Sequence, residues 1–305
     1  MATTPDPGAD RPVELLGSVP GGTGLLAKAA LTSVGRRGAG AGLPDRVLMV
    51  KDQRQDVDRL ADYARVCGFT LRDTVPPTWL HVLTFGLQMD LLTRRDFPFA
   101  AMGMVHVANE MTLHRPVGVD EDLTLTVHAA DLRPHRSGVA FDVVEQVRVG
   151  ADPVWDGRSE YLIRGARLED GAGAPGEGAA ATERAATDPG ARIQPSSTWR
   201  LPADLGRRYA RAAGDYNPIH LHPWSAKALG FPRAIVHGMW THARALAALQ
   251  SRLPASYTTA VQFRKPVLLP STVGFGVRRD DAGEGWDFAV TSRDGAKDHL
   301  LGTVR

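Results

Sequence analysis

The chain has 305 residues, of which 43% are hydrophobic and 7% aromatic, enough for one large domain or two ordinary ones with their own cores. Its 36 basic and 34 acidic residues nearly cancel. This balance argues against nucleic acid or an anionic membrane as the main partner, so a small or moderately sized substrate is expected.

Cys67 is the one cysteine of the sequence. It excludes an intramolecular disulfide and a cysteine-rich metal site, and it suits a reducing cytoplasm. Residues 1–10 show no basic region followed by an apolar stretch, and no run approaches the roughly 20 apolar residues of a membrane span. We therefore predict a cytoplasmic protein without a membrane-spanning segment.

Residues 1–55 are predicted to form an N-terminal extension. A first repeat follows over residues 56–167. It begins with a short amphipathic helix that ends at Gly68 and a long helix over 78–92 that is apolar around most of its circumference. From Leu123 onward, apolar and polar residues alternate as in half-buried antiparallel strands.

Residues 168–195 consist mainly of glycine, alanine and glutamate without apolar periodicity, which predicts a flexible linker. A second repeat over residues 196–305 has the same plan, with its long buried helix expected over 233–250. Each half therefore reads as an α+β unit in which an antiparallel sheet covers a long helix.

Three pairs of short sequences relate the halves, at offsets of 146, 156 and 150: Tyr63 with Tyr209, Leu80-His81 with Val236-His237, and Leu113–Val117 with Phe263–Val267. Their shared order indicates duplication. By the first offset, Phe69 and Thr74 stand opposite Asp215 and His220. The first half then has neither the carboxylate nor the imidazole, and we hypothesise that its shorter sequence leaves room for a long apolar group.

The segment from Gly214 to His220 carries the densest run of reactive side chains. Pro218 disfavours helical geometry at Asn217, so the segment is predicted to be a turn across which Asp215 and His220 can converge. An imidazole beside a carboxylate suits general acid–base work on one water, and Asn217 is expected to fasten the turn. An Asx-type turn with a solvent-exposed histidine explains the same residues equally well.

The sequence Val236-His237-Gly238-Met239 is expected at the start of the long helix, where free backbone N–H groups favour negative charge. Gly238 is a candidate oxyanion-hole donor, because a glycine lets the backbone approach a ligand carbonyl closely. The alternative is a glycine that lets a neighbouring strand pack closely.

Three other chemistries have little support in the sequence. The histidines near Asp215 lack a recognised metal-ligand spacing, so no metal is predicted. The glycine-rich run at 38–42 lacks the spacing of a dinucleotide-binding loop, and no Gly-x-Ser-x-Gly motif indicates a serine hydrolase.

These residues resemble a known family. Gly214-Asp215-Tyr216-Asn217-Pro218-Ile219-His220, followed by Ala226, looks like the signature of MaoC-like dehydratases and R-specific (type-2) enoyl-CoA hydratases. Gly230-Phe231 and Ile235–Met239 extend the similarity, whereas His222 stands where many relatives have aspartate. The duplicated layout resembles the double hot dog form, with two antiparallel sheets, each wrapped on a long central helix.

The resemblance implies a role for several residues. Asp215 and His220 would hold the catalytic water, and the Gly238 N–H would polarise a thioester carbonyl. Asn217, His237, Tyr216 and Phe231 are expected to bind substrate or support the pair. Residues 56–167 would be the degenerate, non-catalytic hot dog and residues 196–305 the catalytic one.

The implied reaction is the reversible syn dehydration of (3R)-3-hydroxyacyl thioesters of CoA or acyl carrier protein, without a metal or organic cofactor. A hot dog thioesterase and a non-catalytic acyl-binding subunit of a dehydratase complex are the alternatives. The sequence leaves a monomer and a homodimer both open.

Overall fold

The structure is a computed structural model, and it describes residues 11–21, 24, 28, 42–168 and 192–305. Most of the predicted linker, residues 169–191, lies outside the described residues.

Over residues 11–21 and 42–168, the first half has two helices among six strands. Its elements are β1 (Val13–Leu15), β2 (Val47–Gln53), α2 (Val57–Cys67), α3 (Pro77–Thr93), β3 (Val105–Leu113), β4 (Leu123–His135), β5 (Gly138–Val149) and β6 (Asp152–Arg164).

The second half repeats this plan with one added segment before its long helix. Its elements are β7 (Ser197–Leu201), α5 (Leu205–Ala213), the 3₁₀ turn η2 (Pro218–His220), α6 (Pro223–Ala228), α7 (Gly238–Leu249), the 3₁₀ turn η3 (Gln250–Arg252), β8 (Tyr257–Phe263), β9 (Ser271–Arg279), β10 (Trp286–Ser292) and β11 (Asp298–Val304).

The strands form one continuous sheet of 11 strands in the order β1-β2-β4-β5-β6-β3-β8-β11-β10-β9-β7. β1 runs parallel to β2, and the other neighbours are antiparallel. The two antiparallel sheets expected from the sequence are therefore joined into one, because β3 and β8 pair along their length. β2 lies within residues 1–55, which were expected to form an N-terminal extension, yet it pairs with β4 and belongs to the sheet of the first half.

The strand order reads as a palindrome about the β3–β8 pair, which indicates a pseudo-twofold axis at the centre of the sheet. Glu110 on β3 lies directly opposite Ala260 on β8. These two residues differ by 150 (260 minus 110), the offset of the third sequence landmark. The internal duplication predicted from the sequence therefore has a structural counterpart.

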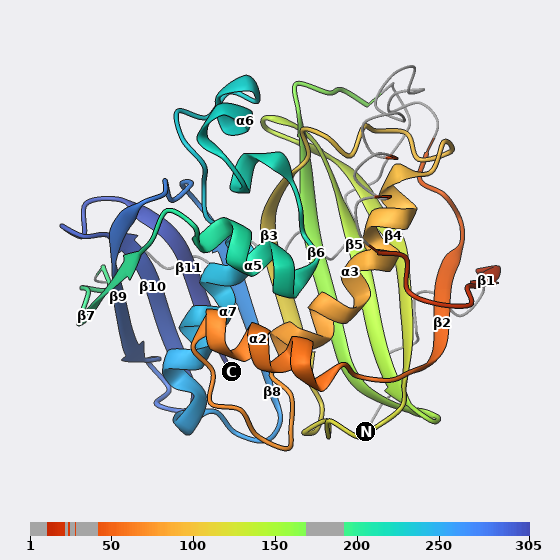
Figure 1. The fold of residues 1–305 in the computed structure, drawn as a ribbon, viewed down its shortest axis with the longest axis horizontal. Coiled ribbons are helices and arrows are strands. Elements are labelled where there is room, and N and C mark those ends of the chain that lie inside the picture. Colours follow the sequence, from red (N-terminus) through yellow and green to blue (C-terminus); the bar gives the residue numbers. More distant parts are fainter. Residues whose placement is uncertain (1–10, 22–23, 25–27, 29–41, 169–191) are drawn as a thin grey trace.

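The helices lie on one face of this sheet (Figure 1). The long helix α3 packs on strands β2 to β6, and α7 packs on β10 and β11. α3 is buried around its circumference because its sequence is apolar on nearly every side. The short helices α2 and α5 pack against each other over the junction of the halves.

The two short helices end alike. Gly68 and Gly214 both adopt the left-handed conformation, with φ of 82° and 84°, and each donates its N–H to the carbonyl of the residue four positions earlier. This confirms the glycine-terminated helices predicted from the first landmark. No helix in the described ranges is long and apolar enough to cross a membrane.

Candidate active site

The turn after α5 holds Asp215 in a fixed place. One carboxylate oxygen of Asp215, Oδ1, accepts the N–H of Asn217 at 3.1 Å, and Oδ1 of Asn217 accepts the N–H of Ile219 at 3.3 Å. These are two consecutive Asx turns. The predicted turn and the fastening role of Asn217 are confirmed.

His220 ends the 3₁₀ turn that follows, and it is buried, with 8% of its surface exposed. Its Nδ1–H donates to the carbonyl oxygen of Ile235 at 2.8 Å. The N–H of Ile235 in turn bonds to the carbonyl of Ile219 at 3.0 Å. The alternative of a solvent-exposed histidine is therefore wrong, and Nε2 is the ring nitrogen left for proton transfer.

His237 joins Asp215 to His220. Its ring stacks on the His220 ring, with centroids 3.7 Å apart, and its Nε2–H donates to the backbone carbonyl of Asp215 at 3.0 Å. The same nitrogen lies 3.7 Å from Oδ2 of Asp215. One side-chain donor atom from each of the three residues lies within 4.8 Å of the others. The structure thus brings together Asp215 and His220, as the predicted turn required, and adds His237, which the resemblance gave as a supporting residue.

Burial makes both imidazoles neutral near pH 7. It lowers the pKa of His220, an effect opposed by the charge of Asp215 and by the hydrogen bond to Ile235. Burial also holds the pKa of His237 well below its ordinary value, and the neighbouring His220 lowers it further. With Nδ1 of His220 donating to a carbonyl, its Nε2 carries a lone pair and can accept a proton.

Gly238 is the first residue of α7, so its N–H belongs to the unbonded first turn of the helix. A side chain there would bring a Cβ within 2.9 Å of the Phe263 ring on β8. Glycine is therefore needed for close packing against a strand, the alternative weighed above. The same position also places an N–H at the positive end of the helix dipole.

The helix starts later than the predicted 233–250. Ile235 forms a β-bridge with Leu268, and the N–H of Val236 bonds to the carbonyl of Val267 at 2.9 Å. These contacts keep the chain extended up to His237, the N-cap, so α7 begins at Gly238.

Two of the predicted supporting residues lie apart from this cluster in the described contacts. Tyr216 is half-buried and lies near Arg59 of the first half. Burial lowers the pKa of Arg59, and Tyr216 opposes this effect. Phe231 is half-buried, and its backbone N–H bonds to Ala226. No described ring contact joins either side chain to Asp215 or His220. Their roles in substrate binding stay predictions.

The first half lacks the whole reactive segment. Thr74 bridges Gly118 as Ile235 bridges Leu268, so Thr74 corresponds to Ile235 and not to His220. The offset here is 161 (235 minus 74), against 146 at the short helices, so the second half has 15 more residues between these points. The pairing of Leu80-His81 with Val236-His237 is therefore wrong, and His81 corresponds to His242.

The same correspondence sets Pro77 against Gly238, since each is the first residue of its long helix. Proline has no N–H. The first half thus lacks the candidate oxyanion donor as well as the acid–base pair, which supports one site per chain.

Sequence reasoning missed three residues that shape the site. A Cβ at Gly206 would overlap the carbonyl oxygen of His220, so this glycine lets α5 lie against the 3₁₀ turn. The ring of Tyr209 lies 4.8 Å from that of His237. Phe263 packs against Gly238. Only Gly206 carried a local signal, because a glycine inside a helix is destabilising and calls for a packing reason.

Asp215, His220 and His237 together offer enough donor atoms to be considered as a metal site. However, Nε2 of His237 is hydrogen-bonded to a carbonyl oxygen and Nδ1 of His220 to another. Nε2 of His220, Nδ1 of His237 and the Asp215 carboxylate are the donors that remain without breaking these bonds. The arrangement is better suited to moving a proton between a carboxylate, an imidazole and a bound hydroxyl group.

Comparisons with known proteins agree with this chemistry. The sequence model of the MaoC like domain matches residues 183–297. The chain is 38% identical to 3-hydroxyacyl-thioester dehydratase X of Mycobacterium tuberculosis over 263 residues, 86% of this chain and 90% of that protein. It is 31% identical to 3-hydroxyacyl-thioester dehydratase Y of the same organism, over 67% of this chain and 75% of the relative.

The fold agrees as well. The crystal structure of HtdX of Mycobacterium tuberculosis superimposes with a TM-score of 0.72 at 36% identity, and the match covers 85% of this chain and 99% of that one. From the shared sequence over most of both chains, this protein belongs to the MaoC-like dehydratase family.

Proposed function

We propose that the protein catalyses the reversible syn dehydration of (3R)-3-hydroxyacyl thioesters to trans-2-enoyl thioesters. The observation that carries this proposal is the cluster of half-buried Asp215 with buried His220 and His237, in which the N-cap residue His237 directly precedes Gly238, the first residue of α7. The names of the two mycobacterial relatives, both 3-hydroxyacyl-thioester dehydratases, support a hydro-lyase acting on a thioester.

Syn elimination removes the α-proton and the β-hydroxyl from one face of the substrate, so its acid and base must stand on the same side. Asp215 and His220 meet this requirement, because their donor atoms lie within 4.8 Å. In the hydration direction, the pair holds a water between Nε2 of His220 and the carboxylate. The pair takes a proton from this water as its hydroxyl group adds to the β-carbon, and then delivers that proton to the α-carbon.

Charge develops on the thioester oxygen as the α-proton leaves. The N–H of Gly238, at the first turn of α7, is placed to stabilise that enolate oxygen. His237 acts as a positioning residue, since it contacts both the Asp215 backbone and the His220 ring.

We extend the proposal to the fold and its setting. The palindromic strand order and the two long helices on one face support a double hot dog in which the sheets have merged. The carrier is CoA or acyl carrier protein, the chain acts as a monomer or homodimer, and the cytoplasm is the expected compartment.

The decisive experiment is hydration of crotonyl-CoA by the purified chain. We expect Asp215→Asn and His220→Ala each to lower kcat/KM by about two to four orders of magnitude, the range that general acid–base groups contribute. Circular dichroism and thermal unfolding would establish that both variants fold.

The matched control is His222→Ala, because His222 lies two residues beyond His220 but is exposed and stacks on Trp224. It should retain near-normal turnover. Near-normal turnover in both dyad variants would refute the assignment. Release of free thiol would indicate the thioesterase instead, and an inactive wild-type chain would favour a non-catalytic subunit.

A metal-independent reaction is expected from the hydrogen bonds that occupy His220 and His237. Dialysis against EDTA should leave the hydration rate within about twofold, since proton transfer by side chains needs no Lewis acid. A loss that Zn²⁺ or Mg²⁺ restores would show that the cluster binds a metal during catalysis.

A further inference from the structure

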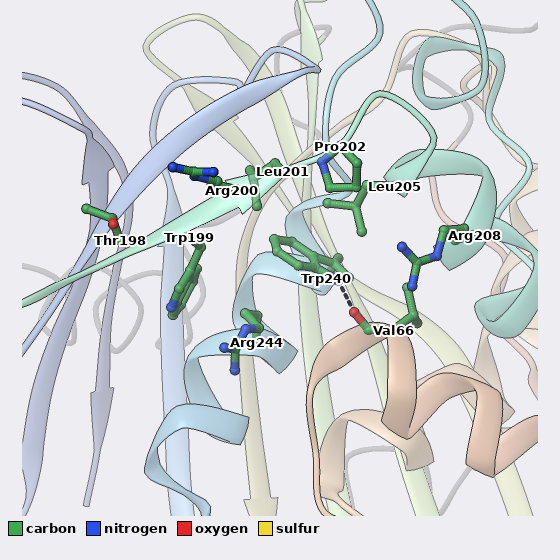
Figure 2. A pocket seen from close by; sticks show the side chains of 10 residues that line it. All are labelled: Val66, Thr198, Trp199, Arg200, Leu201, Pro202, Leu205, Arg208, Trp240 and Arg244. Atoms are coloured by element: carbon green, nitrogen blue, oxygen red, sulfur yellow. Dashed lines mark hydrogen bonds between the residues drawn. The ribbon is translucent and has the colours of Figure 1, made fainter.

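A second site lies outside the acid–base cluster, in a pocket of about 340 Å³. It opens where β7, α5 and α7 meet the end of α2 (Figure 2). The pocket is lined by three arginines, two tryptophans and five other residues: Arg200, Arg208, Arg244, Trp199, Trp240, Val66, Thr198, Leu201, Pro202 and Leu205. The charge of its lining is entirely positive.

The three arginines have no acidic partner in the described part of the chain. None of the ion pairs there includes Arg200, Arg208 or Arg244, and no carboxylate is among the lining residues. Arg200 and Arg208 are exposed, and Arg244 is half-buried. Burial lowers the pKa of Arg244, the direction expected of a cation taken from water without a counter-charge. An anion in the pocket would supply that charge.

Trp199 holds Arg244 in place, and both faces of its ring are covered, which leaves little room for a nucleobase to stack on it. One face of Trp199 is stacked on Phe275 at 4.7 Å, and the Arg244 guanidinium lies 4.8 Å from the centre of its ring. Trp240 meets Trp199 edge-on and donates its Nε1–H to the carbonyl of Val66 at 2.8 Å. Recognition in this pocket must therefore come from charge and hydrogen bonding.

The pocket shares its two helices with the catalytic cluster. Arg208 lies on α5, which leads into Asp215, and Arg244 lies on α7, which begins at Gly238. Arg244 lies six positions after Gly238, which corresponds to about 9 Å along the axis of α7. The pocket therefore lies on the same two helices that position the cluster.

We propose that this pocket binds phosphate groups. Guanidinium groups match the geometry of phosphate oxygens and form paired hydrogen bonds with them. The phosphates belong either to the CoA part of the substrate, a source that rests on the proposed function, or to a free organic phosphate.

The test uses a double variant, Arg200→Gln with Arg208→Gln, which leaves the packed Arg244 in place. Inorganic pyrophosphate is titrated into the full-length protein by calorimetry. The wild type should bind it, and the double variant should bind it at least tenfold more weakly. Arg211→Gln is the matched control, because Arg211 is exposed on the same helix but does not line the pocket.

Kinetics distinguish the two sources. If the phosphates are those of CoA, the double variant raises KM for crotonyl-CoA at least tenfold but leaves unchanged the KM for crotonyl N-acetylcysteamine thioester, which has no phosphate. If they belong to a free ligand, pyrophosphate binding falls while both KM values stay as in the wild type. Either result supports phosphate binding in this pocket.

The proposal is overturned if wild type and double variant bind pyrophosphate equally, or if Arg211→Gln weakens binding as much. Titration does not depend on turnover. A wild-type chain that hydrates no thioester would therefore contradict the proposed function and still leave the phosphate site decided by the titration.

Discussion

At the scale of single residues, two stacked imidazoles define the chemistry of the cluster. His220 and His237 lie with their ring centroids 3.7 Å apart, and both are shielded from water. A proton on one would repel a proton on the other and would lack hydration. Asp215 offsets part of this cost for His220. Of the two rings, His220 is therefore the one suited to exchange protons with a substrate.

This environment predicts the pH dependence of the reaction. Because burial lowers the pKa of His220 below 6.5, the imidazole stays neutral as the pH falls from 8 to 6.5 and gains a proton only below that value. We expect kcat/KM for crotonyl-CoA hydration to be flat over this range and to decline in more acidic buffer. Circular dichroism at each pH would separate the decline from unfolding.

An acidic limb centred at or above pH 6.5 would contradict a neutral, buried His220. If the acidic decline of kcat/KM occurs at the same pH in a weakly active Asp215→Asn variant, the assignment of this decline to His220 would also be contradicted. Removing the carboxylate charge removes an effect that raises the pKa of His220, so the limb should move to lower pH.

The residues that sequence could identify are those joined by local geometry. Pro218 and Asn217 fix a turn of a few residues, and this turn made the convergence of Asp215 and His220 predictable. The bond from His220 to Ile235 spans 15 residues, and the stacking on His237 depends on how two segments pack. A single sequence contains no local signal for such contacts.

At the scale of elements, the site depends on how closely α5 approaches the 3₁₀ turn. Gly206 is the second residue of α5, and a glycine in a helix lowers its stability. The backbone of His220 occupies the space that a side chain at Gly206 would take. The same closeness fixes the position of the His220 ring, because that backbone carries it.

We therefore expect Gly206→Ala to affect both stability and turnover. The added methyl group would overlap the carbonyl of His220 and push the turn away, at a cost of about 1–3 kcal/mol in unfolding free energy. The shift would misplace Nε2 and lower kcat at least tenfold, since small misplacements of reacting groups are costly. Urea unfolding and crotonyl-CoA hydration measure the two effects.

Gly17→Ala is the control, because a Cβ at Gly17 meets no atom within 4 Å. It should change neither quantity. If Gly206→Ala proves more stable than the wild type with full activity, as a glycine-to-alanine change in an unconstrained helix would be, the contact with His220 does not position the site.

The long helices were predicted well in the first half and less well in the second. The expected helix over 78–92 matches α3, because an uninterrupted apolar run needs little tertiary information. The expected helix over 233–250 includes Ile235 and Val236, which are apolar but lie extended in contact with the 266–268 region. Apolar content alone does not separate a buried helix from a buried extended segment.

At the scale of the whole molecule, the duplication was visible in the sequence and the joining of the halves was not. Apart from β1, each half contributes five strands in mirrored order, and β3 and β8 close the edges that each half would expose alone. Pairing of two edge strands depends on their tertiary approach. The repeat pattern of a single chain therefore predicts two related halves without identifying β3 and β8 as the strands that join their sheets.

Two shielded histidines lie near this junction: His242 is buried, and His106 is half-buried with its Nε2 atom shielded from water. His106 on β3 lies between the rings of Tyr161 and Phe263, at 4.9 and 5.0 Å, and His242 on α7 bonds to Thr259. Burial, with a smaller contribution from the nearby His81, lowers the pKa of both His106 and His242 to about 3. These groups are neutral in the folded protein at any pH at which the enzyme is expected to work.

Their burial predicts acid sensitivity of the fold. An unfolded chain takes up protons on these histidines near pH 6.5, whereas the folded chain does so near pH 3. The free energy of unfolding therefore falls as the pH drops through this window. At pH 5, 1.5 units below the unfolded pKa, each histidine costs about 2 kcal/mol.

His106→Phe tests this assignment, because Nε2 of His106 is shielded and has no hydrogen-bond partner in the described part of the chain, so an aromatic ring without it can keep the stacking. Urea unfolding at pH 7 and pH 5 gives the loss of unfolding free energy between the two. We expect this loss to be about 2 kcal/mol smaller in His106→Phe than in the wild type. The exposed His222→Ala should lose as much as the wild type. An equal loss in His106→Phe and wild type would mean that His106 takes up its proton without unfolding, and that the junction of the two halves admits water.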